Sequence, residues 1–202
     1  MDAFDKLPDT LEGFVWRNEP KSWSLERGVL RVRAEAQTDF FVDPDGSNAR
    51  ASAHLLHFAA DGDFDLSARV AVEMASPYDS ACLMVVADDA HWAKVCYEFW
   101  HGVPSIVSVV TKGYSDDALS HGLGACRPYL RVLRSGNAFG LHYSLDARVW
   151  TVVRYFHLDA PSLLRVGFAA QCPVGEGCDI TFSDVRFTPG RIEDARVVAT
   201  QS

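Results

Sequence analysis

The segment HWAKVCYEFW, residues 91–100, alternates between two kinds of side chain, and this period of two decides the fold. Successive side chains of a β-strand point to opposite faces, so the alternation predicts a strand with two distinct surfaces. One surface is apolar and suits a core: Ala93, Val95, Tyr97 and Phe99. The other mixes large aromatic and charged side chains: Trp92, Lys94, Cys96, Glu98 and Trp100. Exposed aromatic rings beside a few charges often mark a binding surface, so this second face is predicted to be one.

The same period recurs along most of the chain and predicts an all-β protein. Residues 28–36 (GVLRVRAEA) and 63–73 (DFDLSARVAVE) alternate apolar and polar side chains. Further strands are predicted at 80–88, 104–111, 128–136, 138–146, 149–157, 163–171 and 178–188. Turn-forming segments such as DPDGSN, AADGD and PVGEG lie between the strands, and no segment shows a sustained helical period. This pattern predicts a two-sheet antiparallel jelly-roll β-sandwich, and the lack of a linker predicts a single domain over residues 1–202.

The composition excludes two classes of partner. The chain has 202 residues and a formal net charge of −8, whereas nucleic acids and anionic membranes are bound by basic surfaces. Neither is therefore expected as the main partner. The first residues, MDAFDKLPDT, do not resemble a secretory signal, and no apolar run is long enough to span a bilayer. These features predict a cytoplasmic protein.

The five cysteines are predicted to be free thiols, because their number is odd and their spacing irregular. Cys172 and Cys178 bracket the segment PVGEG and can approach each other, so a disulfide or a metal role for these two stays open, although neither is preferred. The segment DPDGSN begins like a calcium-binding loop, but its glycine comes too early and His54 stands where a glutamate ligand is needed. A β-turn is the preferred interpretation. No metal site and no cofactor are predicted.

Neighbouring segments carry side chains of the same kind as the mixed face of residues 91–100. If these strands share a curved outer sheet, aromatic rings and charged groups converge in one groove, with Lys94 and Glu98 at its centre and Asp79, Asp116 and Arg154 at its walls. Sugars suit such a groove, since their C–H faces stack on rings and their hydroxyls bond to charged groups. The candidate ligand-binding residues are Tyr78, Asp79, Trp92, Lys94, Glu98, Thr111, Asp116, Arg131, Trp150 and Arg154. In the alternative interpretation, loops cover this face and Lys94 forms a structural ion pair with Glu98.

A string of motifs adds a family resemblance. The motifs are, in order, FVWRNEPKSW, TDFFVDPDG, GDFDLSARV, PYDSACLMV, HWAKVCYEF, SVVTKGYSD, LHYSLDARVWTVVRYF and RVGFAAQCPVGEG. Over roughly residues 14–187 the chain resembles a family of largely uncharacterised proteins that is labelled after a yeast regulator of enolase. The resemblance implies a concanavalin A-like lectin/glucanase fold and no settled activity. The chain departs from the family pattern at Ser80-Ala81-Cys82 and at Asp117, close to the predicted groove, so its ligand preference is expected to differ from that of relatives.

Three functions remain open at this point. Non-catalytic binding of a carbohydrate or another small polar ligand is preferred, with a link to the regulation of carbohydrate metabolism. A protein-interaction or regulatory module is the first alternative, with a protein as partner. A glycoside hydrolase or lyase that uses Glu98 is the second, but residues 91–100 hold a single glutamate where glucanases of the superfamily carry two. No catalytic residue is therefore assigned, and enzymatic activity is left open, with a non-catalytic role preferred.

Overall fold

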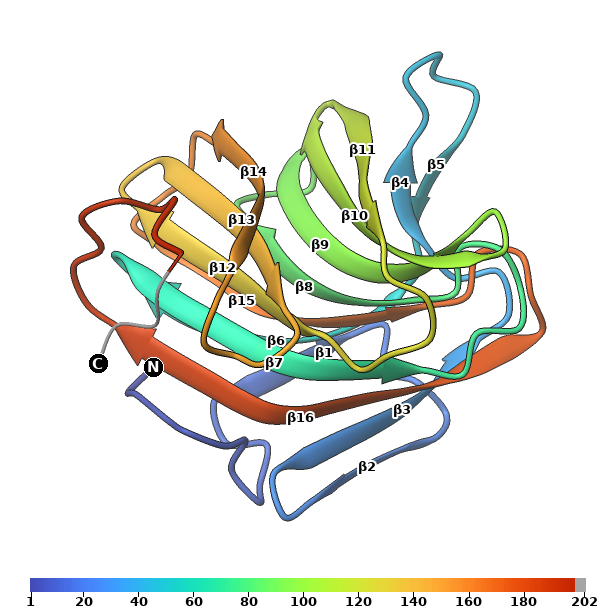
Figure 1. The fold of residues 1–202 in the computed structure, drawn as a ribbon, viewed down its shortest axis with the longest axis horizontal. Coiled ribbons are helices and arrows are strands. Elements are labelled where there is room, and N and C mark those ends of the chain that lie inside the picture. Colours follow the sequence, from blue (N-terminus) through green and yellow to red (C-terminus); the bar gives the residue numbers. More distant parts are fainter. Residues whose placement is uncertain (199–202) are drawn as a thin grey trace.

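Strand alternation produces two antiparallel sheets of seven strands in the computed structural model, which describes residues 1–198 (Figure 1). The first, here the β9 sheet, has the spatial order β1 (Phe14–Arg17), β6 (His54–Asp61), β15 (Leu163–Gln171), β8 (Ser80–Val86), β9 (His91–Trp100), β10 (Val103–Lys112) and β11 (Tyr114–Gly122). The second, here the β7 sheet, has the order β14 (Thr151–His157), β13 (Ala138–Ser144), β12 (Tyr129–Ser135), β7 (Phe64–Val72), β16 (Gly177–Pro189), β3 (Val29–Glu35) and β2 (Trp23–Glu26).

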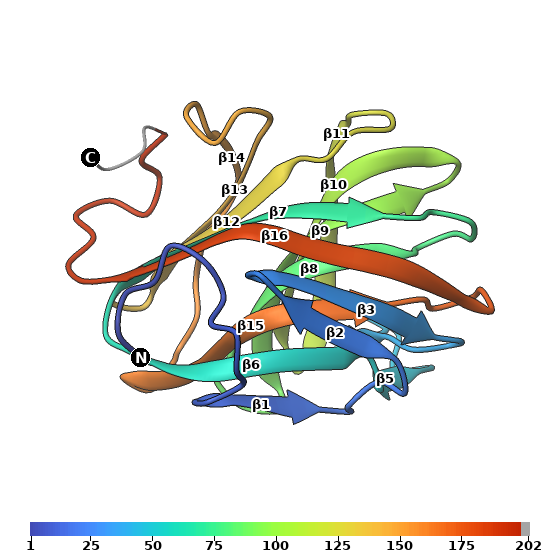
Figure 2. The ribbon, with the colours of Figure 1, turned by 90° about the horizontal axis from the view of Figure 1, so that it is seen from below.

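The two sheets form the layers of a sandwich. Figure 2 shows β1, β6 and β15 in one layer and β7 and β16 in the other. The prediction of an all-β, two-sheet antiparallel sandwich is confirmed. Among the described residues there is no helix that is long and apolar enough to cross a membrane.

Strand β7 shows how alternation builds the core. Phe64, Leu66 and Ala68 are fully buried between the sheets, while Asp65 and Ser67 face outward. Each buried Leu or Phe side chain contributes roughly 1.5–3 kcal/mol through the apolar surface that it removes from water. Strand β16 pairs with β7 on one side and β3 on the other, so residues far apart in the sequence meet in the middle of this sheet.

Strand β9 is covered on both faces, which differs from the expectation of an exposed outer face. Ala93, Val95 and Tyr97 join the core between the sheets. On the opposite face, Trp92 and Cys96 belong to a second apolar cluster. Its members are Phe40, Ala53, Leu55, Cys82, Met84, Val86, Trp92, Cys96, Val107, Val109 and Ala169. The outer face of β9 is therefore apolar where Trp92 lies.

The cover over β9 is a small hairpin formed by β4 (Phe40–Val42) and β5 (Ala49–Ala51). The ring of Phe40 in this hairpin packs against the ring of Trp92, and the two ring centroids lie 6.3 Å apart. The connecting segment DPDGSN forms a turn, in which Gly46 N donates to Asp43 O at 2.9 Å. Val42 N donates to Ser115 Oγ at 2.9 Å and thereby attaches the hairpin to β11. Figure 1 shows the hairpin rising beside β10 and β11.

Candidate functional site

A cavity of about 510 Å³ lies on the outer face of the β9 sheet, where the β4–β5 hairpin stands over β9 and β10. This volume is within the range of small-molecule sites, ~300–1,000 Å³. We call it the β9 cavity. The sheet contributes Lys94, Glu98, Trp100, Val107, Val109, Asp117 and Gln171 to its lining. The hairpin and nearby loops contribute Gln37, Asp39, Phe41, Asp43, Asn48, Arg50, Tyr78, Pro173 and Val174.

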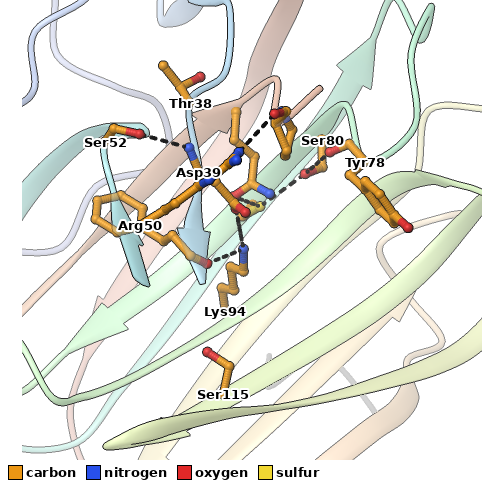
Figure 3. Close-up of polar contacts among 12 residues, drawn as sticks. Thr38, Asp39, Arg50, Ser52, Tyr78, Ser80, Lys94 and Ser115 are labelled. Atoms are coloured by element: carbon orange, nitrogen blue, oxygen red, sulfur yellow. Dashed lines mark hydrogen bonds and ion pairs between the residues drawn. The ribbon is translucent and has the colours of Figure 1, made fainter. Parts of the chain in front are cut away.

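Lys94 lies at the inner end of the β9 cavity and is 2% exposed. Its Nζ donates to Phe40 O at 2.8 Å and to Gln171 Oε1 at 2.9 Å, and lies 3.6 Å from Asp39 Oδ1. Figure 3 shows the side chain reaching from β9 toward Asp39. Burial is the largest single effect and acts to lower the pKa of Lys94, but the neighbouring acidic groups, Asp39 first among them, together outweigh it, and the pKa is raised above its ordinary value.

The partners of Lys94 define its role. An ammonium group has three N–H donors, and that of Lys94 faces three oxygen atoms of the protein. These oxygens belong to the β4 segment and to β15, so Lys94 connects both to β9. Its ion pair is formed with Asp39 and not with Glu98, the partner that the alternative sequence interpretation suggested. Lys94 therefore positions the walls of the cavity rather than offering a free donor to a ligand.

Glu98 lies four residues further along the same face of β9 and is 5% exposed. Burial raises the pKa of its carboxyl group to about 7, and the lowering effect of nearby Lys94 is smaller. At neutral pH this group is therefore divided between its neutral and charged forms. Glu98 can donate a hydrogen bond in the first form and accept several in the second.

Two aromatic rings border the cavity beside Glu98. The rings of Tyr78 and Trp100 pack edge to face, with centroids 5.8 Å apart at an angle of 74°. Tyr78 has a φ of 71°, which is uncommon for a residue with a side chain, and both rings are only half-buried. The half-exposed pair offers an apolar surface next to the polar groups.

The lining of the β9 cavity is acidic and rich in acceptors. The carboxylates of Asp39, Asp43, Glu98 and Asp117 face two cationic side chains, Lys94 and Arg50. Arg50 also bonds to the protein, because its Nη1 donates to Pro173 O at 3.0 Å. Such a lining suits a ligand with many hydroxyl or ammonium donors and disfavours an anionic one.

Of the residues predicted from the sequence, Tyr78, Lys94 and Glu98 line the β9 cavity. Three others from the same region are buried beside it. Trp92 is 4% exposed and lies in the apolar cluster under Phe40. Thr111 is fully buried and bonds to Ser115 Oγ at 2.8 Å, and Asp79 is fully buried below the turn that precedes β8. Trp92, which the sequence interpretation placed on an exposed outer face, is therefore a core residue.

Arg131 and Trp150 are placed on the outer face of the other sheet, away from the β9 cavity. Arg131 Nε donates to both carboxylate oxygens of Asp65 at 3.0 Å. The guanidinium carbon of Arg131 lies 5.1 Å from the ring centroid of Trp150. Both residues line a second cavity of about 430 Å³. The core of the sandwich separates these residues from Glu98.

Asp116 and Arg154 pair with each other between the edges of the two sheets. Arg154 Nη2 lies 2.9 Å from Asp116 Oδ2, and Arg154 Nη1 donates to Asp116 O at 3.1 Å. The pair joins β14 to β11, the edge strands of the two sheets. The structure therefore does not place these two residues, or Asp79, at the walls of a groove centred on Glu98.

Sequence reasoning missed the residues that the hairpin brings to the cavity, above all Asp39 and Arg50. The signal was present, because DPDGSN is a turn between two short runs, FFV and ARA. Runs of three residues are too short for alternation to be read, so the hairpin was not predicted as such. Alternation had placed Trp100 on the same face as Lys94, but nothing in the spacing of Gln171, on another predicted strand, marked it as a neighbour of Lys94.

The sandwich and its outer cavity define the class of the protein as a concanavalin A-like, lectin-like β-sandwich. The metal-free form of lectin I-B4 from Griffonia simplicifolia superposes with a TM-score of 0.59 over 89% of this chain and 94% of the lectin chain, at 12% identity. A GH43 protein from Bacillus licheniformis superposes with a TM-score of 0.71 over 94% of this chain and 39% of that chain, at 18% identity. At such low identities the likeness concerns the fold alone.

Residues 16–190 match the family described as protein of unknown function, DUF1349, and the chain belongs to this family. The protein named Regulation of enolase protein 1 of Saccharomyces cerevisiae is 32% identical over 175 residues, which cover 86% of this chain and 88% of the yeast protein. A crystal structure described as a functionally unknown protein from the same yeast has a TM-score of 0.84 over 89% of this chain and 98% of that chain, at 31% identity. The resemblance inferred from the sequence motifs is confirmed.

Proposed function

We propose that this protein binds a carbohydrate or a similarly small, hydroxyl-rich ligand in the β9 cavity and does not transform it. One observation carries the proposal: a cavity of about 510 Å³ combines the buried carboxyl group of Glu98 with the half-exposed rings of Tyr78 and Trp100. The C–H face of a sugar packs on such rings, while its hydroxyl groups donate to carboxylates. The acidic lining favours a neutral or amino sugar over a phosphorylated one.

The related structures support the part of this proposal that concerns carbohydrate binding in general. A lectin shares the fold, and a GH43 protein shares it over 39% of its own chain, so the fold is compatible with carbohydrate binding. A regulatory protein partner rests only on the name of the yeast relative. A link to the regulation of carbohydrate metabolism and a cytoplasmic location stay predictions.

Hydrolysis through Glu98 is the second candidate, and a specific observation favours it. Glu98 has a pKa of about 7, while Asp39, which lines the same cavity, is paired with the ammonium of Lys94. A carboxyl group with a raised pKa, beside a second carboxyl group in the same site, is a common feature of acid–base catalysis. Non-catalytic binding is preferred because Asp39 is engaged by Lys94.

The test is binding of the purified protein to an array of neutral, amino, acidic and phosphorylated mono- and oligosaccharides, followed by calorimetric titration of the hits. Neutral or amino sugars are expected to bind. Glu98→Gln and Trp100→Ala are expected to weaken the best hit by about 10-fold or more. The matched controls are Glu73→Gln and Tyr155→Ala, which alter exposed residues outside the cavity and should leave binding unchanged.

Two results would overturn the proposal. The first is that no sugar on the array binds, and the second is that Glu98→Gln and Trp100→Ala bind as tightly as the wild type. If the wild type released new reducing ends from a bound oligosaccharide and Glu98→Gln did not, the hydrolase candidate would be favoured over non-catalytic binding.

A further inference from the structure

Three potential metal ligands meet below the turn that precedes β8. A carboxylate oxygen of Asp79, Cys172 Sγ and Cys178 Sγ all lie within 4.8 Å of one another. The three residues are 0%, 0% and 1% exposed. Asp79 immediately precedes β8, Cys172 follows β15, and Cys178 is the second residue of β16. Three separate segments thus deliver one donor atom each to the same buried point.

The Asp79 carboxylate is held in place and yet has an unused oxygen. Its Oδ2 accepts hydrogen bonds from Ala75 N at 3.0 Å and Ser76 N at 2.8 Å. Its Oδ1 is buried and has no hydrogen-bond partner among the described residues. An unsatisfied buried carboxylate oxygen costs free energy and calls for a physical reason. Carboxylates that bind metals are oriented by hydrogen bonds in this way, with a free oxygen left for the ion.

We propose that Asp79, Cys172 and Cys178 bind a thiophilic divalent metal ion, with zinc as the reference case. Two thiolates and one carboxylate are ligands that zinc prefers. Binding replaces the two thiol protons, which leave to the solvent; the 2+ charge of the ion balances the two thiolates, and the Asp79 carboxylate supplies the third ligand. Three protein ligands leave one tetrahedral position for an oxygen donor.

Gly175, between the two cysteines, packs closely beside the cluster. A Cβ atom on Gly175 would lie 2.6 Å from Ser76 Oγ and 2.9 Å from Cys172 Sγ, so only glycine allows the segment to approach both. The segment between the two cysteines therefore packs against both Ser76 and Cys172.

The metal site would fix one wall of the β9 cavity. Pro173 and Val174 line that cavity and belong to the segment between the two cysteines. Arg50 donates to Pro173 O at 3.0 Å, which connects the same segment to the hairpin. The metal proposal does not depend on the identity of any ligand in the cavity, because its donors lie in the core.

The experiment uses the full chain, reduced and freed of metal with a chelator, and titrates it with Co²⁺. One Co²⁺ per chain is expected to produce the thiolate-to-cobalt absorption of a tetrahedral site, and Zn²⁺ is expected to displace it. Cys172→Ser and Cys178→Ser should weaken binding at least about 100-fold, beyond the effect of a lost outer-shell group. Cys126→Ser is the control, since Cys126 is not part of the cluster and should leave the absorption unchanged.

A second measurement keeps the test independent of folding defects. Zn²⁺ should raise the thermal midpoint of the wild type and of Cys126→Ser, but not of Cys172→Ser, since only a chain that binds the ion gains stability from it. Absence of the cobalt absorption in the folded wild type would overturn the proposal. So would equal binding by Cys172→Ser, or a Cys172–Cys178 disulfide in protein isolated without metal.

Discussion

Lys94 Nζ lies 3.6 Å from Asp39 Oδ1, and this contact joins the middle of β9 to the start of the β4–β5 hairpin (Figure 3). The same ammonium donates to Phe40 O and Gln171 Oε1. Because all of these groups lie next to the β9 cavity, one buried cation determines where the hairpin stands. The shape of the cavity therefore depends on a residue that has no free donor for a ligand.

Replacing Lys94 by Met should destabilise the protein strongly. The change removes the cation but leaves Asp39 and two acceptors in a buried place, and breaking a buried pair in this way costs about 3–5 kcal/mol. Lys21→Met is the matched control, because the Lys21–Glu35 pair is exposed and such pairs contribute less than about 1 kcal/mol. Urea unfolding measures both. A Lys94→Met variant as stable as the wild type would show that the hairpin is held by other contacts.

Glu98 should make the protein less stable as the pH rises. The folded protein keeps the proton of Glu98 up to its pKa of about 7, whereas the unfolded chain releases it near the ordinary value of 4.5. Between these values the folded state binds more protons, so the free energy of unfolding falls with increasing pH, by a total on the order of 3 kcal/mol. Below pH 4.5 and above pH 7 this group contributes no slope.

Urea unfolding between pH 5 and pH 8 tests this behaviour in the wild type and in Glu98→Gln. The variant cannot ionise at this position, so its stability should lack the decline and should equal or exceed that of the wild type at pH 8. Glu73→Gln, which alters an exposed carboxylate, should keep the decline. Parallel profiles for the wild type and Glu98→Gln would mean that Glu98 is ionised in the fold like any surface glutamate.

Alternation predicted the sandwich because its central strands each have one face in the core. Strands β3, β7, β9 and β16 carry apolar residues at every second position, which is the signal that burial of one face leaves in a sequence. Strand β6 was missed because its first three residues are all buried, and the alternation that follows has alanine on both faces, so HLLHFAAD shows no clear period of two. Strands β1, β2, β4 and β5 were missed because three or four residues carry too little pattern.

The candidate site was predictable only in part, for a related reason. The sequence shows which face of a strand a residue occupies, but not which strands are neighbours in space or what covers them. Lys94 and Glu98 were identified because they interrupt an apolar pattern on one strand. Arg131 and Trp150 have the same chemical character, but their strand segments belong to the opposite sheet. Pairing between strands that are distant in the sequence decides to which sheet a strand belongs, and no local sequence pattern shows this pairing.

The whole chain should unfold in a single transition. Strand β16 from the end of the chain pairs with β3 and β7 from its first half, and β15 pairs with β6 and β8, so neither half can complete its sheet alone. Scanning calorimetry should therefore show one peak with equal calorimetric and van't Hoff enthalpies. Two separated peaks would contradict the expectation of a single domain.

The two tryptophans on the outer face of β9 should separate stability from binding. Trp92 is buried against Phe40, and its replacement by Ala leaves a void that costs about 3–5 kcal/mol. Trp100 is half-buried at the cavity border, so Trp100→Ala should cost no more than about 1–2 kcal/mol and yet weaken the best sugar found on the array by about 10-fold or more. Trp92→Phe, which refills most of the space, should bind that sugar like the wild type. Urea unfolding measures the loss of stability, and calorimetric titration measures the loss of binding. A Trp92→Ala variant as stable as the wild type, or a Trp100→Ala variant that binds the sugar normally, would contradict the roles assigned to these two rings.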